Sequence, residues 1–245
     1  MTASNIFSSS LTLFRDSPRS VRVALFLFFV AGLADGILVP FFALWAQKDT
    51  GIPTEYIGLL LGCYAGGELL ATPFVGGIAD RVGRRPVLLI STVGVGLGFL
   101  MLYLTRGVVA TAVSLIVIGM FESVLHPTAA TVIADTVPAD KLRGHFALTR
   151  MMSNAGSMLG PALGAVLVLW SLGLVFFGAG ACLLVGTVAV AAFLPETWQR
   201  GTKSDEDDDE ESLVALTAAF HDRRLAGLLL PIAADRKSTR LNSSH

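Results

Sequence analysis

The sequence is poor in charge. Only 15% of the 245 residues are Asp, Glu, Lys or Arg, whereas 53% are hydrophobic. The apolar residues form long blocks, without the short periods that are typical of strands or amphipathic helices. Because about 20 consecutive apolar residues in a helix cross the hydrocarbon core of a bilayer, the blocks predict membrane-spanning helices. The composition argues against a soluble globular domain.

Several kinds of site are missing from the sequence. The net charge is −1 and no basic, aromatic-rich patch occurs, so we expect no nucleic-acid partner. Both cysteines, Cys63 and Cys182, lie within apolar blocks and predict neither a disulfide nor a metal site. The sequence also lacks the motifs of phosphate loops, redox dithiols, zinc proteases and serine hydrolases, so we expect no cofactor and no enzyme activity.

Six apolar blocks are present, and each is long enough to cross a bilayer. They cover residues 23–45, 57–75, 86–104, 108–133, 146–170 and 172–194. Every backbone polar group in hydrocarbon must be satisfied within its own segment, so the blocks predict helices. Short connections favour antiparallel neighbours in a bundle. Since the first block lacks the pattern of a cleaved signal peptide, we expect it to stay in the membrane.

Basic residues are concentrated in alternate connections. They precede the first block, follow the second, separate the fourth from the fifth and follow the sixth, while the opposite connections carry only Lys48 and Arg106. The positive-inside rule therefore predicts that residues 1–22 and the chain after residue 195 are cytoplasmic. We expect a multi-pass protein of the plasma membrane, or of the inner membrane in a bacterium.

The chain changes character after the sixth block. Residues 196–224 contain the acidic run SDEDDDEE, which predicts a solvated cytoplasmic linker. Residues 225–234 have the composition of a seventh span that stops early. Residues 235–245 read as the translation of a sequencing adapter, and we exclude them from the fold prediction as non-native. We therefore expect the first half of a longer protein.

The connection between the second and third blocks carries a dense motif, GGIADRVGRR, over residues 76–85. Its characteristic members are Gly76, Asp80, Arg81, Gly83, Arg84 and Arg85. In spacing and in position the motif resembles the signature loop of the major facilitator superfamily. The resemblance implies the six-helix N-terminal half of a twelve-helix, all-α membrane fold, in which this loop acts as a conformational switch. For Arg84 and Arg85, plain anchoring at the cytoplasmic surface is the alternative.

A second resemblance lies in the fifth block, whose small residues are similar to a pattern associated with antiporters of this superfamily. The residues are Arg150, Asn154, Gly156, Gly160, Pro161 and Gly164. A packing interface of small residues, with Arg150 and Asn154 as anchors or caps, is the alternative interpretation. The fourth block departs from the antiporter pattern, because Leu115 stands where that pattern has an arginine.

Ionisable groups inside predicted spans are costly, about 2.5–3.5 kcal/mol each at a helix centre, and are therefore functional candidates. Asp35 lies in the first block and Glu68 in the second, while Glu122 and His126 lie one turn apart in the fourth. We interpret them as candidates for proton coupling or for contact with a cationic substrate. Asp35 is the strongest, because helix one lines the central cavity in the family that the sequence resembles. Structural hydrogen bonds between helices are the alternative.

The resemblance implies a secondary transporter in a lipid bilayer, with a small-molecule substrate, protons and a missing C-terminal half as its partners. We predict proton-coupled export of a small amphipathic compound. The leucine at position 115 leaves an uptake symporter or a facilitator for a metabolite as an alternative. A polytopic sensor or scaffold that does not transport is another.

Overall fold

The computed structural model describes residues 12–74, 79 and 82–194, and all regular structure in them is helical. The elements are α2 (Arg19–Lys48), α3 (Glu55–Ala71), the 3-10 turn η1 (Thr72–Phe74), α5 (Arg84–Leu104), α6 (Val108–Thr136), α7 (Ala139–Val168) and α8 (Gly173–Phe193). The linker expected at 196–224, the seventh span expected at 225–234 and the segment 235–245 lie outside the described residues.

The six α-helices follow the six predicted spans, and they confirm an all-α membrane protein. Five of them, α2, α5, α6, α7 and α8, are long and apolar enough to cross a membrane. Helix α3 has 17 residues and passes into η1, where Pro73 cannot donate a backbone hydrogen bond. Helix α7 begins at Ala139, before its predicted start at residue 146, and has Asp140 in its first turn, where an acidic group is favourable.

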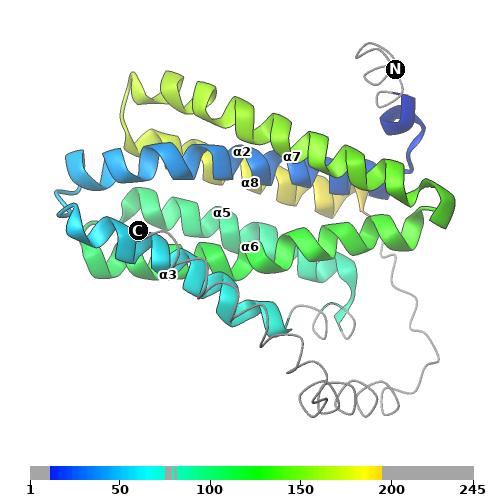
Figure 1. The fold of residues 1–245 in the computed structure, drawn as a ribbon, viewed down its shortest axis with the longest axis horizontal. Coiled ribbons are helices and arrows are strands. Elements are labelled where there is room, and N and C mark those ends of the chain that lie inside the picture. The colour runs from blue at the N-terminus through cyan, green and yellow to red at the C-terminus, as the bar shows by residue number, and fades with distance from the viewer. Residues whose placement is uncertain (1–11, 75–78, 80–81, 195–245) are drawn as a thin grey trace, which may run out of the picture. The chain divides into compact units, whose positions relative to one another are not determined.

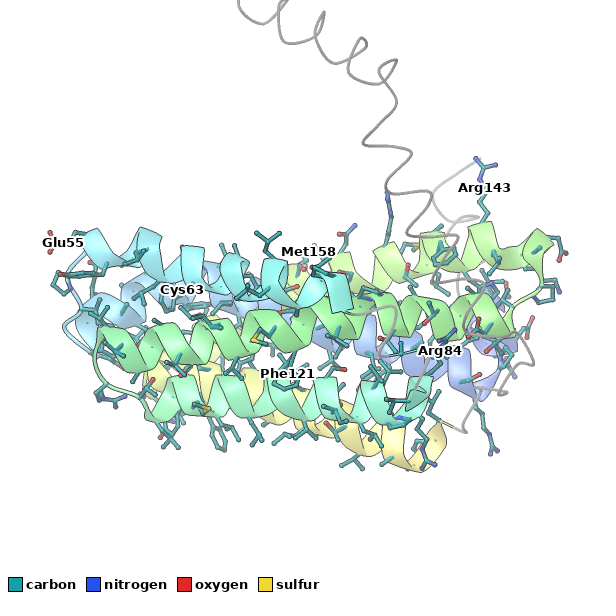
Figure 2. All side chains as sticks on the ribbon, turned by 90° about the horizontal axis from the view of Figure 1, so that it is seen from below. Glu55, Cys63, Arg84, Phe121, Arg143 and Met158 are labelled. Carbon is teal, nitrogen blue, oxygen red and sulfur yellow. The ribbon has the colours of Figure 1, made fainter. Side chains whose placement is uncertain are left out.

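The helices pack along one another as a bundle (Figure 1). Helix α2 contacts α6, α7 and α8, while α3 packs on α6, and α5 packs on both α6 and α8. Figure 2 shows Glu55 at one end of the bundle and Arg143 at the other. Helix α2 begins, and α8 ends, at the Arg143 end.

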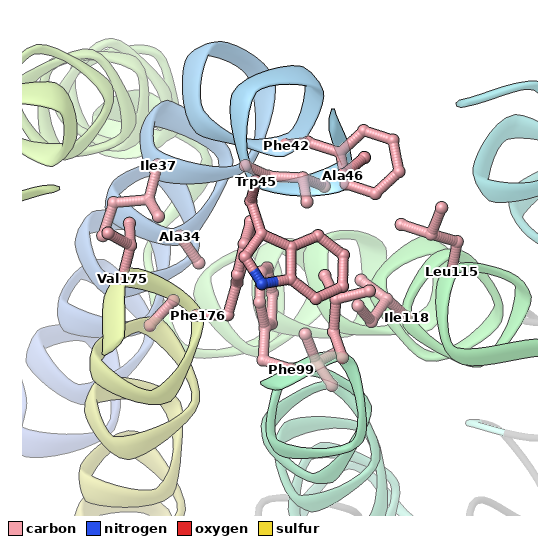
Figure 3. Close-up of a cluster of buried hydrophobic side chains, with 14 of the residues drawn as sticks. Ala34, Ile37, Phe42, Trp45, Ala46, Phe99, Leu115, Ile118, Val175 and Phe176 are labelled. Carbon is pink, nitrogen blue, oxygen red and sulfur yellow. The ribbon is translucent and has the colours of Figure 1, made fainter. Parts of the chain in front are cut away.

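The largest apolar cluster surrounds Trp45, which is fully buried. Its ring meets Phe176 edge-on with the centroids 5.1 Å apart, and the centroid of Phe42 is 6.2 Å away. Phe99 and Leu115 complete the surroundings of the indole (Figure 3). These side chains belong to α2, α5, α6 and α8, so the cluster holds four helices together.

Helices α2 and α7 touch through their backbones. A Cβ added to Gly156 would overlap the carbonyl oxygen of Phe29, and one added to Gly160 would lie 2.5 Å from that of Leu33. The hydroxyl of Ser157 also donates a hydrogen bond to the Gly32 carbonyl oxygen, at 3.1 Å. The small residues of the fifth span therefore form a packing surface against the first span, as expected of membrane helices that associate by close contact.

We predict that Gly156→Ala forces α2 and α7 apart and lowers the free energy of unfolding by about 1–3 kcal/mol, the usual cost of overpacking. The measurement is the thermal midpoint of the purified chain in detergent. Gly62→Ala is the matched control, because nothing lies within 4 Å of a Cβ at that position. Equal midpoints for the two variants would contradict the assignment of Gly156 to a tight interface.

Candidate functional site

Three of the ionisable residues predicted from the sequence converge between α2 and α6. Asp35 on α2 meets Glu122 and His126 on α6, and one ligand-type atom of each lies within 4.8 Å of those of the other two. Glu122 is only 3% exposed, whereas Asp35 and His126 are half-buried. We call these three residues the Asp–Glu–His cluster.

The carboxylate of Glu122 is approached from two sides. The hydroxyl of Tyr64 donates a hydrogen bond to its Oε2 at 2.9 Å, and Nε2 of His126 lies 3.8 Å from its Oε1. The imidazole of His126 also lies against Phe28 of α2, with the ring centroids 5.4 Å apart. Tyr64 is a residue that the sequence analysis missed. The feature of the sequence that could have indicated Tyr64 is its position four residues before Glu68, on the same side of α3.

Gly119 explains how α3 comes so close to α6. A Cβ at this position would overlap the carbonyl oxygen of Tyr64 and would lie 3.1 Å from the backbone nitrogen of Glu68. Gly67, on α3, faces the backbone of α6 in the same way. Because Glu122 follows Gly119 by nearly one turn, this contact places the Tyr64 hydroxyl within hydrogen-bonding reach of its carboxylate.

A cavity of about 570 Å³ adjoins the cluster. Glu122 and His126 form part of its wall, Glu68 contributes a third acidic group from α3, and Arg84 lines it from the start of α5. Hydroxyl groups of α6, such as that of Thr131, add polar lining. The structure thus brings all four predicted ionisable residues to one region, with Asp35 in the cluster but not in the cavity wall.

The charges of the Asp–Glu–His cluster constrain what it can do. Two carboxylates about 5 Å apart repel by roughly 3 kcal/mol at an effective dielectric constant near 20. A proton on a carboxyl group, a protonated imidazole or a bound cation offsets this repulsion. The repulsion between the two carboxylates therefore favours the binding of one positive charge in the cluster. Two carboxylates and an imidazole at these separations are also able to bind a divalent cation.

The predicted conformational-switch motif is described only in part. Gly76, Asp80 and Arg81 lie outside the described residues. Gly83 directly precedes α5 with a φ of 101°, a left-handed conformation that glycine adopts without steric cost. The glycine of the motif therefore sets the turn from which the two following arginines enter α5.

Both arginines of the motif tie the start of α5 to other helix ends. Arg84 forms an ion pair with Asp135 near the end of α6, with Nε 3.0 Å from Oδ2. Arg85 donates a hydrogen bond from Nη2 to the carbonyl oxygen of Ala191 in the last turn of α8, at 2.8 Å. Each side chain therefore makes a specific contact between helices in addition to any anchoring role. Asp135 has no motif around it and was not predicted from the sequence.

The other residues of the fifth-span motif stay away from the cluster. Arg150 and Asn154 are exposed, and neither lines the cavity. Gly164 faces the ring of Phe41 on α2, and Pro161 is half-buried within α7. Leu115, which occupies the place of an arginine in the antiporter pattern, is fully buried in the apolar core.

The fold and the site define a multi-pass, all-α membrane protein with ionisable groups in its interior. The chain belongs to the Major Facilitator Superfamily, whose family model matches residues 24–234. This match confirms the resemblance that the loop at 76–85 indicated, and with it the assignment to a family of membrane transporters.

Curated relatives of the chain are named for drug resistance. The quinolone resistance protein NorA of Staphylococcus aureus (strain MRSA252) is 25% identical over 163 residues, which cover 66% of this chain and 42% of NorA. The class E tetracycline resistance protein of Escherichia coli is 27% identical over 194 residues, which cover 78% of this chain and 48% of the relative. The chain spans about half the length of the curated relatives it matches.

Solved transporter structures share the fold. A peptide transporter POT in complex with sulfate superposes with a TM-score of 0.66 at 19% identity, covering 88% of this chain and 47% of the transporter. The human organic anion transporter MFSD10 (TETRAN) gives 0.61 at 22% identity, covering 74% and 48%. These similarities confirm the predicted fold, which corresponds to about half of each of the two solved structures.

We predict that Tyr64→Phe, which removes the hydrogen bond to Glu122, lowers the free energy of unfolding by about 1 kcal/mol, as is usual for hydrogen bonds between membrane helices. Thermal unfolding of the purified chain in detergent measures the change. Tyr56→Phe is the control, because the Tyr56 hydroxyl has no hydrogen bond within the described part of the chain. An unchanged midpoint for Tyr64→Phe would show that the contact does not hold the site.

Proposed function

We propose that the complete protein exports small amphipathic compounds in exchange for protons, and that this chain is its N-terminal half. The observation that carries the proposal is the Asp–Glu–His cluster, which gathers two carboxyl groups and an imidazole from two helices beside a cavity that Glu68 and Arg84 also line. Placing ionisable groups inside a membrane helix costs free energy, and this argues against a purely structural role for them.

The exchange follows from the charge balance of the cluster. One positive charge offsets the repulsion between Asp35 and Glu122, and either a proton or a cationic substrate can provide it. A substrate that enters the cavity beside His126 displaces the proton, and a new proton displaces the substrate after the transporter has opened to the other side. The hydrogen bond from the Tyr64 hydroxyl positions the Glu122 carboxylate for this exchange.

The second wall of the substrate cavity comes from the C-terminal half of the complete protein. Large apolar side chains on α3 and α7 are exposed in this chain, among them Leu69 at 75% and Met158 at 76%. We assign these faces to contact with the C-terminal half, which would rock against this one during alternating access. The distribution of basic residues supports a cytoplasmic N-terminus in the plasma membrane.

Two features favour export over uptake. The relatives are named for resistance to quinolones and to tetracycline, and a membrane transporter can confer resistance by moving a compound out of the cell. The small residues Gly156, Gly160 and Gly164 follow the antiporter-like pattern of the fifth span. An uptake symporter or a facilitator is the alternative that the transport assay must distinguish.

The test is transport by the full reading frame, extended past residue 234 and reconstituted into liposomes. We predict that an imposed proton gradient drives the uphill movement of a quinolone or of tetracycline in the direction opposite to that of the protons. This movement should be lost when the gradient is collapsed. Glu122→Gln should abolish the coupled movement, because it removes one exchangeable charge. Glu55→Gln, at the exposed start of α3, is the matched control and should behave as the unchanged protein.

Three outcomes would reject the proposal. They are movement that ignores the proton gradient, movement of substrate in the same direction as the proton, and full coupling in Glu122→Gln. Residues 1–234 alone should insert into the membrane without transporting, because the cavity then has only one wall. Transport by this half alone would contradict the assigned role of the C-terminal half, unless two copies associate.

A further inference from the structure

A second cavity, of about 450 Å³, lies between the start of α2 and the end of α8. We call it the α2–α8 groove, and its lining consists of Phe14, Arg19, Arg22, Val23, Phe26, Ala189 and Phe193. None of these residues lines the cavity beside the Asp–Glu–His cluster. The groove lies at the Arg143 end of the bundle, where α2 begins and α8 ends (Figures 1 and 2).

The rim of the groove is cationic. Arg19 and Arg22 are both exposed, and they stand three residues apart on α2, so their side chains leave the helix on one face. Within the part of the chain that the structure describes, neither guanidinium forms an ion pair or a side-chain hydrogen bond. Two guanidinium groups without partners are therefore available to an anion at this rim.

The floor of the groove is apolar. Phe26 lies one turn further along α2 than Arg22, and Ala189 and Phe193 face it from α8. Phe193 is 59% exposed, although it is a large aromatic side chain. The groove thus places two guanidinium groups beside an apolar surface that α2 and α8 form together.

We propose that the α2–α8 groove binds an anionic phospholipid from the leaflet in which α2 begins. The headgroup phosphate contacts Arg19 and Arg22, since the planar guanidinium suits phosphate oxygens, and an acyl chain lies along Phe26 and Phe193. A phospholipid uses both parts of the groove, whereas a soluble anion would use only the rim. The site goes beyond the proposed transport function and does not depend on it.

The test uses the purified 245-residue chain in detergent, with bound lipid counted by native mass spectrometry. The probes are phosphatidylglycerol and phosphatidylcholine with identical acyl chains. Each arginine near an anionic headgroup is worth about 1 kcal/mol, which is about fivefold because 1.4 kcal/mol is a factor of ten. Arg19 and Arg22 together should therefore give a preference for phosphatidylglycerol of about thirtyfold. The double variant Arg19→Gln, Arg22→Gln should abolish this preference, and each single variant should reduce it about fivefold.

Two controls separate this site from general attraction to positive charge. Arg143→Gln removes an exposed arginine at the same end of the bundle but outside the groove, and should leave the preference unchanged. Phe193→Ser should weaken the binding of both lipids and leave their ratio intact.

Equal binding of both lipids by the unchanged chain, or an unchanged preference in the double variant, would overturn the proposal. Equal loss in Arg143→Gln would also overturn it. Glycerol phosphate at millimolar concentration should not displace phosphatidylglycerol. Displacement would identify a site for a free anion and reject the lipid. Should the double variant fail to fold, the single variants decide the matter.

Discussion

The backbone contact between α3 and α6 at Gly119 is the constraint on which the candidate site depends. A side chain at this position would collide with the carbonyl oxygen of Tyr64, so the two helices could not approach as they do. Their approach carries the Tyr64 hydroxyl to Glu122, and that hydrogen bond holds a buried carboxylate in position beside His126. The packing of α3 on α6 at Gly119 therefore determines how the Glu122 carboxylate is hydrogen-bonded.

Backbone contacts at glycine residues also hold α2 against α7, and they also help to position a residue of the candidate site. Because Gly156 and Gly160 allow the backbones to touch, α2 is fixed on one side by α7 and on the other by α6 and α8. Asp35 lies on this clamped helix. The apolar cluster around Trp45 fixes the far end of α2, so the position of Asp35 relative to Glu122 is set by packing along most of the helix.

The two ends of the bundle are held together by different kinds of contact. At the Glu55 end, Trp45, Phe99 and Phe176 interlock as a dry core. At the Arg143 end, polar ties join helix ends, with Arg84 on Asp135 and Arg85 on the carbonyl oxygen of Ala191. Ion pairs with an exposed partner such as Asp135 contribute little net free energy, so these contacts stabilise the Arg143 end less than the apolar core stabilises the other end.

Hydropathy predicted the six spans well, because the length of an apolar block is a property of the local sequence. Helix α7 was the exception: its polar first turns carry no hydropathy signal, and it begins at Ala139. The spacing of Glu122 and His126 likewise predicted neighbours on one helix. The meeting of Asp35 with Glu122, and the contact from Tyr64, could not be predicted from the sequence, since they depend on the relative register of helices that is set by packing between them. Asp135 was missed for the same reason.

In the proposed mechanism the Asp–Glu–His cluster exchanges a proton for substrate. The most direct measurement is the release of protons when substrate binds to the full-length protein in weakly buffered detergent solution, followed with a pH indicator. The account predicts that saturating substrate releases about one proton per transporter, and that Glu122→Gln releases none while Glu55→Gln releases as many as the unchanged protein. Substrate binding without proton release in the unchanged protein would contradict it.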